Sequence, residues 1–116
     1  MIQQGEVYWI DLGMPVGSAP GYRRPGIVVQ NDGLNATGLR TVVVVTLTTN
    51  LRRSLAVGNV LLREGEAGLP KPSVVNVTQI LTVDRSQLAE RIGMLSRRRV
   101  LEIIDGIRLV LEPIEP

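Results

Sequence analysis

A run of β-branched residues at 41–47, which includes the consecutive valines Val42 to Val45, most constrains how this chain can fold. Such a run is apolar on both faces of a strand, and strands buried on both faces lie in the interior of a sheet. We therefore predict a central strand at 41–47. Shorter apolar runs bounded by glycine, proline or other turn residues predict further strands at 7–12, 25–30, 59–63, 73–81 and 88–94, with turn residues at 31–33.

The last segment has a helical rather than a strand pattern. Val100, Ile104, Ile107 and Leu111 recur at spacings of four, three and four residues, which predicts one apolar helical face. Ser96 is the expected N-cap, and Pro113 the expected stop. The fold expected from these elements is mainly β, a small curved sheet or half-open barrel of antiparallel strands followed by a C-terminal helix, in a single domain spanning 1–116.

Arg97, Arg98 and Arg99 fall in the first turn of that helix, where the helix dipole disfavours positive charge. Two interpretations remain open. The three side chains are solvated at a cost of tenths of a kcal/mol each, which we favour, or they serve a function.

Composition excludes several kinds of chemistry. The chain has no cysteine and no histidine, so a zinc finger, a thiol nucleophile, an imidazole base and a disulfide are excluded. No carboxylate pair or cluster indicates an acid/base couple or a magnesium site, and no metal or cofactor is expected. No targeting or membrane-spanning segment is recognisable, so a cytoplasmic protein that does not bind membranes is the expectation.

The basic residues are unusual in kind, because Lys71 is the one lysine among 13 lysines and arginines. Arginine binds phosphate through two N–H groups and stacks on bases, although a coding bias towards arginine is an equally good explanation. Tyr22, Arg23 and Arg24 end a glycine- and proline-rich loop at 13–24 and form a candidate cluster for single-stranded nucleic acid. Thr48 follows the apolar strand in a polar segment at 46–50, which ordinary β-propensity and an asparagine turn also explain.

Taken in order, these segments resemble the MazF/PemK family of toxin endoribonucleases over nearly the whole chain. The segments that carry the resemblance are Gly5-Glu6-Val7-Tyr8-Trp9-Ile10-Asp11-Leu12, Gly17-Ser18, Arg23-Arg24-Pro25, Val28-Val29-Gln30-Asn31-Asp32, Thr46-Leu47-Thr48-Thr49, Lys71-Pro72-Ser73, Val77-Thr78-Gln79 and Thr82-Val83-Asp84-Arg85.

The resemblance implies an SH3-like barrel with a C-terminal helix, as in the PemK/CcdB-like toxin fold, a homodimer, and a cognate antitoxin. It also implies metal-independent cleavage of single-stranded RNA, expected to be mRNA, by the RNA's own 2′-hydroxyl, leaving a 2′,3′-cyclic phosphate and a 5′-hydroxyl. By motif position the catalytic residues are Arg24 and Thr48. The residues expected to bind RNA are Ser18, Tyr22, Arg23, Asn31, Thr49, Ser73 and Gln79.

The loop before Arg24 departs from the family pattern, because Ala19-Pro20-Gly21-Tyr22 stands where many relatives carry polar residues and glycines. This change bears on the RNA sequence cut more than on activity. Two other functions stay open, a toxin of the same fold that inhibits a protein such as DNA gyrase, and an RNA-binding module without catalysis. Leu51, Leu55 and Val57 are either exposed for a partner or part of the core.

Overall fold

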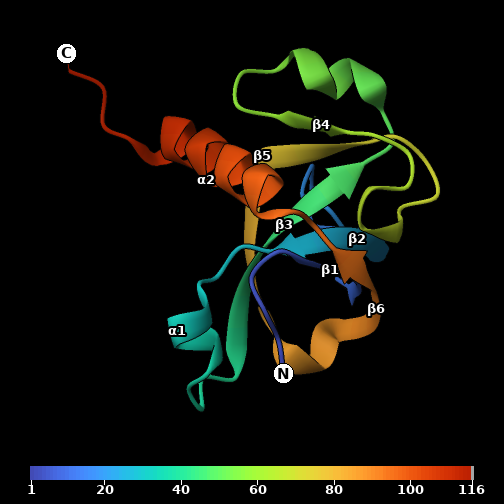
Figure 1. Cartoon of the computed structure of the whole chain (residues 1–116), viewed down its shortest axis with the longest axis vertical. Coiled ribbons are helices and arrows are strands. Elements are labelled where there is room, and N and C mark those ends of the chain that lie inside the picture. Colours follow the sequence, from blue (N-terminus) through green and yellow to red (C-terminus); the bar gives the residue numbers. More distant parts are fainter. Residues whose placement is uncertain (116) are drawn as a thin grey trace.

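The valine run forms the centre of one antiparallel sheet in the computed structural model, which describes residues 1–115. The run is strand β3 (Thr41–Thr48), and it pairs with β2 (Arg23–Val28) on one side and β5 (Ser73–Asp84) on the other. The six strands lie in the order β4-β5-β3-β2-β1-β6 (Figure 1), and the predicted central strand is confirmed. The other strands are β1 (Glu6–Asp11), β2 (Arg23–Val28), β4 (Val60–Leu62), β5 (Ser73–Asp84) and β6 (Leu88–Met94).

Two apolar clusters bury both faces of β3. Val45 and Leu47 belong to one cluster, while Val42 and Val44 belong to the other. Alternate side chains of a strand point to opposite faces, so this division follows directly from the sequence. The first cluster also contains Ile103 of the C-terminal helix α2 (Arg97–Leu111), which packs on β5. The structure is therefore mainly β with a C-terminal helix, as predicted.

Helix α2 begins and ends where its capping residues predict. Ser96 Oγ accepts a hydrogen bond from the Arg99 backbone N–H at 3.3 Å, and the helix ends at Leu111, before Pro113. Val100, Ile104 and Ile107 pack against the core, but Leu111 of the predicted face is 67% exposed. Figure 1 shows the reason, since the C-terminal part of α2 extends past the edge of the sheet.

The interpretation of Arg97, Arg98 and Arg99 as three solvated charges is wrong for Arg99, which is paired. Its guanidinium bonds Glu66 at 2.8 Å and Glu102 at 2.9 Å, and the side chain is 14% exposed. Arg97 and Arg98 are exposed, as predicted. Glu66 begins the short helix η2 (Glu66–Gly68), so Arg99 joins α2 to that segment.

Several boundaries differ from the predicted ones. The strand predicted at 25–30 begins at Arg23 and ends at Val28, so both candidate arginines lie in β2 and not in the preceding loop. The turn predicted at 31–33 is wrong, because Asn31 caps the short helix α1 (Asp32–Asn35) through a bond from the Leu34 N–H. Asparagine serves both turns and helix caps, which explains the error.

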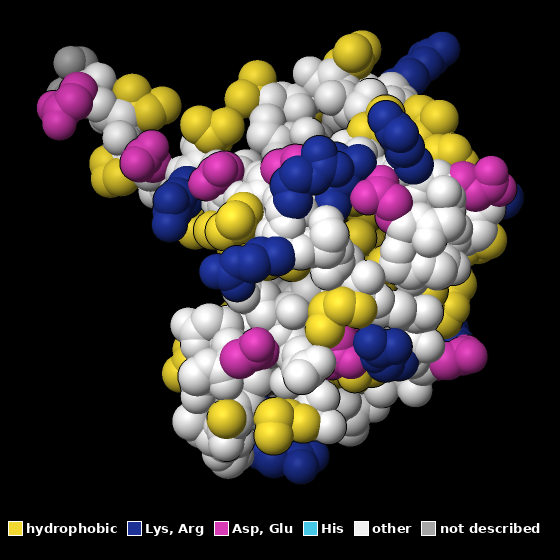
Figure 2. Space-filling view, in the orientation of Figure 1, with side chains coloured by type: hydrophobic (Ala, Val, Ile, Leu, Met, Phe, Trp, Pro, Cys, Tyr) yellow, Lys and Arg dark blue, Asp and Glu magenta, His cyan; other side chains and the backbone are white. Residues whose placement is uncertain are grey.

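Short helices also lie between other strands of the sheet. The residue Asn50 caps η1 (Leu51–Leu55), and Asp84 caps η3 (Arg85–Gln87). Leu55 and Val57 are 87% and 81% exposed, so they do not belong to the core. Figure 2 shows hydrophobic side chains standing out along the upper edge of the molecule, above η1 and the C-terminal half of α2. Across residues 1–115, no helix is long and apolar enough to cross a membrane.

Candidate functional site

The predicted catalytic residues Arg24 and Thr48 come together because β2 and β3 are antiparallel neighbours. Gly26 lies opposite Thr46 in the antiparallel register. Arg24, two residues before Gly26, therefore lies at the level of Thr48, two residues after Thr46. Both line one cavity of about 350 Å³ at this end of the two strands. The pairing of β2 with β3 thus places a guanidinium and a hydroxyl at one opening.

Four of the residues expected to bind RNA line the same cavity. Tyr22 and Arg23 border it on the β2 side, Thr49 follows Thr48 on the β3 side, and Ser73 comes from the start of β5. The remaining lining residues are Trp9, Gly21, Pro25 and Leu47. The cavity wall therefore offers two guanidinium groups, several hydroxyls and two aromatic rings, and no carboxylate of residues 1–115 lines it.

Arg24 is oriented through one of its nitrogens. Its Nε donates a hydrogen bond to the Gly21 carbonyl oxygen at 3.2 Å, while the side chain stays exposed. The terminal nitrogens have no hydrogen bond within residues 1–115, which leaves the fork that binds phosphate oxygens available. On the other wall, Thr48 Oγ1 accepts the Asn50 backbone N–H at 3.1 Å, so its own O–H remains able to donate.

Tyr22 is presented to solvent by a left-handed backbone, with φ at 58°. Its N–H donates to the Gly13 carbonyl at 2.5 Å, and its carbonyl accepts the Leu12 N–H at 2.7 Å. These two bonds fasten the end of the loop to the end of β1 (Glu6–Asp11). The ring stands 62% exposed at the cavity, where it can stack on a base.

Arg23 is arranged on an aromatic ring rather than free in solvent. Its guanidinium carbon lies 5.6 Å from the Trp9 ring centroid, within the range of a cation–π contact. The same side chain donates to Glu90 Oε2 on β6 at 3.3 Å. Trp9 is a site residue that sequence reasoning missed. Strand alternation sends Tyr8 and Trp9 to opposite faces, but Trp9 then shares a face with the buried core residue Val7, so alternation alone does not mark it as a site residue.

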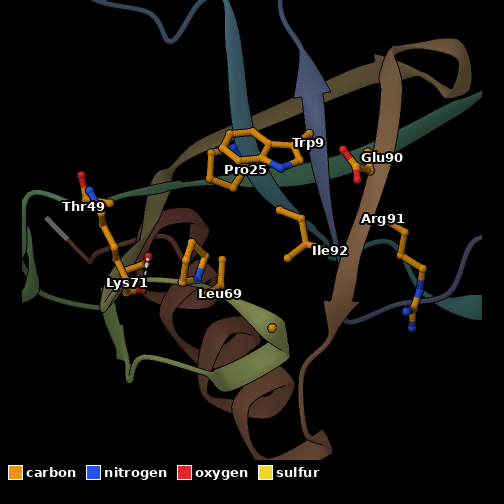
Figure 3. A pocket seen from close by; sticks show the side chains of 11 residues that line it. Trp9, Pro25, Thr49, Leu69, Lys71, Glu90, Arg91 and Ile92 are labelled. Atoms are coloured by element: carbon orange, nitrogen blue, oxygen red, sulfur yellow. Dashed lines mark hydrogen bonds between the residues drawn. The ribbon is translucent and has the colours of Figure 1, made fainter.

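A second cavity of about 510 Å³ adjoins the first, and Figure 3 shows most of the side chains that line it. Trp9, Pro25, Thr49 and Ser73 line both cavities. The residues specific to the second cavity come from the segment before β5 and from β6, namely Gly68, Leu69, Pro70, Lys71, Glu90, Arg91 and Ile92. Lys71 was noticed in the sequence as the one lysine, but its place beside the site depends on the fold.

Three residues expected to bind RNA lie outside both cavities. Asn31 caps α1, beyond the far end of β2 from Arg24, and Ser18 lies exposed in the loop between β1 and β2. Gln79 accepts hydrogen bonds from the Thr46 hydroxyl at 2.6 Å and from Asn76 at 3.4 Å. Thr46 is buried, so this network braces β3 against β5 two residues before Thr48. A role for these three residues in RNA binding stays a prediction.

The titratable groups on the face of β1 opposite Trp9 form a separate network. Burial, followed by the charge and hydrogen bond of Glu6, raises the pKa of Tyr8 above its ordinary value of 10.0. The buried Glu6 carboxylate also accepts a bond from Arg91 Nε. Among the described residues no group of three or more Asp or Glu side chains is placed to hold a metal ion.

The first cavity is chemically suited to bind an anion with guanidinium and hydroxyl donors.

Comparison with known sequences identifies the protein family to which this chain belongs. Residues 3–111 match the model of the PemK-like, MazF-like toxin of type II toxin-antitoxin systems. The chain is similar to Endoribonuclease MazF2 of Mycobacterium bovis, with 41% identity over 112 residues, 97% of this chain and 98% of that one. It is also similar to Endoribonuclease MazF of Staphylococcus epidermidis, with 32% identity over 111 residues, 96% of this chain and 92% of that one.

Solved structures with lower sequence identity share the fold. A mycobacterial endoribonuclease in complex with its cognate antitoxin superposes with a TM-score of 0.79 at 24% identity, covering 100% of both chains. MazF from Deinococcus radiodurans superposes with a TM-score of 0.78 at 21% identity, covering 97% of both chains. These likenesses show the arrangement of sheet and helix.

Proposed function

Because the chain belongs to the PemK-like, MazF-like toxin family of type II toxin–antitoxin systems, we propose that it is a toxin that cuts single-stranded RNA at a short preferred sequence without a metal ion. The observation that carries the proposal is the single cavity lined by Arg24 and Thr48 at the paired ends of β2 and β3. The expected biological substrate is mRNA.

The chemistry needs no nucleophile from the protein. The 2′-hydroxyl oxygen of RNA attacks the adjacent phosphorus, the bond from phosphorus to the 5′-oxygen breaks, and a proton passes from the first oxygen to the second. The products are a 2′,3′-cyclic phosphate and a 5′-hydroxyl. The protein's task is to orient the 2′-hydroxyl and to stabilise the charge that builds up on the phosphate oxygens.

Arg24 and Thr48 divide that task. The free terminal nitrogens of Arg24 donate to the phosphate oxygens, and the Thr48 hydroxyl donates to a phosphate oxygen or holds the attacking hydroxyl. A guanidinium keeps its proton far above neutral pH, so electrostatic stabilisation is the favoured role for an arginine here rather than proton transfer. Tyr22 and Arg23 grip the flanking nucleotides by stacking and charge.

The test is cleavage of a long single-stranded RNA in EDTA, with the new ends mapped chemically. We expect discrete cuts that leave 5′-hydroxyl ends. Arg24→Ala is expected to slow cleavage by about 100-fold or more, the typical effect of losing one donor to a developing oxyanion. Arg40→Ala is the matched control, because Arg40 precedes β3 at the opposite end of the strand from Thr48. This variant is expected to cut RNA at the wild-type rate.

Two further substrates and variants separate the proposed roles. An RNA with a 2′-deoxynucleotide at the mapped cut site has no nucleophile and is expected to bind without being cut. Thr48→Val removes the hydroxyl and is expected to slow cleavage, whereas Thr48→Ser keeps a hydroxyl and is expected to keep cleavage. Thr82→Val, at an exposed threonine of β5, is the control. RNA left whole by folded wild-type protein would favour a protein-targeting toxin such as a gyrase inhibitor, or a non-catalytic RNA-binding module.

We also propose two protein partners, a second copy of the chain and a cognate antitoxin. The homodimer contact is placed on the outer apolar surface, defined as Leu55, Val57 and Val110. Gly58 and Gly106 approach so closely that the segment after η1 lies alongside α2, the helix that carries Val110. The antitoxin is expected to place an apolar and acidic segment at the arginine-lined cavity and to compete with RNA there.

Sedimentation measures the dimer directly. Leu55→Glu with Val57→Glu is expected to give a monomer, because two charges would be desolvated at the contact. Leu39→Glu, an exposed leucine before β3, is the control and is expected to stay dimeric. If the double variant sediments as the wild type does, the homodimer contact does not lie on this surface.

A further inference from the structure

We propose that the second cavity, lined by Trp9, Pro25, Leu69 and Ile92 beside the catalytic pair, receives one nucleobase of the substrate RNA next to the cut phosphate. This inference rests on the proposed function, because it concerns a nucleotide neighbouring the one at Arg24. It names the residues that read one base of the cut sequence.

The interior of the cavity is apolar and its charges lie at the margin. In Figure 3 the side chains of Trp9, Pro25, Ile92 and Leu69 converge on the same space. Lys71 and Glu90 lie at opposite sides of it, and the Arg91 guanidinium points away, where Glu6 accepts its Nε–H. An apolar interior with a few polar groups at the edge suits a flat, polar-edged ring better than a phosphate.

Trp9 supplies the surface on which such a ring would stack. The indole is held by Arg23, whose guanidinium lies 5.6 Å from the ring centroid and also bonds Glu90. Single-stranded nucleic acids are bound by stacking successive bases on aromatic side chains beside positive charge. Lys71, at the other margin, can donate to the edge of a base or to the next phosphate.

The floor of the cavity is built by close backbone packing, so the space exists before any ligand arrives. A Cβ placed on Gly93 of β6 would lie 2.1 Å from the Ala67 carbonyl oxygen, and one on Gly68 would lie 2.9 Å from the Ile92 carbonyl oxygen. These contacts hold η2 against β6. The Glu66–Arg99 ion pair fixes the same segment to α2, so Leu69 and Lys71 extend from a fastened loop.

Continuity with the first cavity selects RNA as the occupant. Trp9, Pro25, Thr49 and Ser73 form walls common to both spaces. An RNA whose phosphate contacts Arg24 and Thr48 therefore continues into the second cavity without leaving the protein surface. An apolar side chain of a protein partner is the competing occupant, and the experiment below distinguishes the two.

Trp9 is the single tryptophan of the chain and lines both cavities, so its fluorescence reports on RNA in these two adjoining spaces, and the abasic positions identify the base that stacks on it. The titration uses uncleavable RNAs that carry a 2′-deoxynucleotide at the mapped cut site. One has all its bases, and the others have an abasic residue at successive positions around the cut. We expect the complete RNA to quench Trp9, and one abasic position to abolish the quenching and weaken binding about tenfold, the typical value of a stacked base.

Ile92→Phe provides the second measurement, because the larger ring occupies part of the cavity without adding a fluorescent indole. We expect this variant to bind the complete RNA about tenfold more weakly, with no further loss on the abasic RNA, since one interaction cannot be lost twice. Leu39→Phe is the matched control, with wild-type behaviour expected. If Ile92→Phe does not fold, Trp9→Leu replaces it, with binding read by labelled RNA.

Two results would overturn the inference. In the first, every abasic RNA quenches Trp9 and binds as the complete RNA does, which leaves the cavity to a protein side chain. In the second, the losses from Ile92→Phe and from the abasic position multiply, which places the base elsewhere. RNA that is bound and quenches Trp9 but whose all-ribose form is never cut would contradict the proposed function and leave the base pocket standing.

Discussion

Tyr22 holds a backbone conformation that tyrosine rarely adopts, at the point where the loop after β1 enters β2. The left-handed region costs an ordinary L-residue about 1 kcal/mol or more, because its Cβ crowds the following carbonyl. The ring recovers little of that cost through packing, since it is 62% exposed. A residue kept under strain with its aromatic ring at a cavity is consistent with selection for ligand contact.

Tyr22→Asn separates stability from RNA contact. Asparagine tolerates the left-handed region, so we expect the free energy of unfolding in urea to rise by roughly 0.5–1 kcal/mol. Loss of the ring is expected to weaken binding of uncleavable RNA by about tenfold, the typical value of a stacked base. A variant that is less stable than the wild type would show instead that the tyrosine ring supports the loop.

At this scale the sequence identified candidate residues within single segments, and their catalytic role stays a prediction. Arg24 and Thr48 were assigned by motif position, and the pairing of β2 with β3 then placed them at one cavity. Trp9 and Lys71 could not be assigned, because the second cavity joins β1, β6 and the segment before β5. No local pattern records which distant segments share a wall.

At the scale of elements, the docking of α2 depends on a backbone contact. A Cβ on Gly106 would lie 2.2 Å from the Gly58 carbonyl oxygen and 3.0 Å from Val77. Gly106 lowers the intrinsic stability of the helix by about 1 kcal/mol relative to alanine. The close approach to Gly58 explains why a glycine stands in the middle of the helix.

Gly106→Ala is therefore expected to destabilise the protein even though alanine favours helices. Overpacking costs about 1–3 kcal/mol or more, and a clash with backbone is at the upper end, so we expect a net loss of roughly 2 kcal/mol in the free energy of unfolding. Urea denaturation measures it. Gly38→Ala is the control, because nothing lies within 4 Å of its added Cβ. A rise in stability for Gly106→Ala would mean that α2 can shift away from Gly58 freely.

The link between η2 and α2 is sensitive to pH through Glu66. The Arg99 hydrogen bonds hold the pKa of the Glu66 carboxyl below its ordinary value of 4.5, and the Arg63 backbone N–H adds to this effect. A carboxyl whose pKa is lower in the folded protein contributes stability above the unfolded-state pKa and loses that contribution as pH falls through the folded-state value. The stabilisation is thus complete near neutral pH and disappears in acid.

Glu66→Gln tests this link without removing the side chain. At pH 7 we expect the free energy of unfolding to fall by about 1.5–3 kcal/mol, the range for hydrogen bonds to charged groups. The difference from wild type should narrow as the pH is lowered below 4.5, the ordinary pKa of the carboxyl, because protonated Glu66 resembles glutamine. Glu64→Gln, an exposed neighbour, is the control. A difference that is constant with pH would assign the loss to packing.

Long elements with a strong apolar pattern were predictable, and short ones were not. The apolar run of β3 and the periodic face of α2 were both found, α2 with its caps. The short helices α1 and η1 are capped by Asn31 and Asn50, and asparagine in sequence indicates a turn equally well. Arg99 was misjudged because its partner Glu66 is 33 residues away.

At the scale of the whole molecule, the positive charge matters through its placement. The net charge is only +2, so the field of the whole chain attracts RNA weakly. Arg23, Arg24 and Lys71 nevertheless border the two cavities with cationic groups at the space where the RNA is proposed to lie. Binding should therefore depend on salt through these few contacts rather than through all 13 basic residues.

This placement predicts the size of the salt dependence. Each phosphate contact on single-stranded nucleic acid contributes about 0.7 to the slope of log affinity against log salt, so three contacts give a slope of about −2. We expect Lys71→Gln to make the slope shallower by about 0.7 and Arg40→Gln to leave it unchanged, because Arg40 lies at the opposite end of β3. The measurement is a titration of uncleavable RNA at several salt concentrations. A slope that responds to Arg40→Gln but not to Lys71→Gln would place the RNA at the other end of the sheet, away from both cavities.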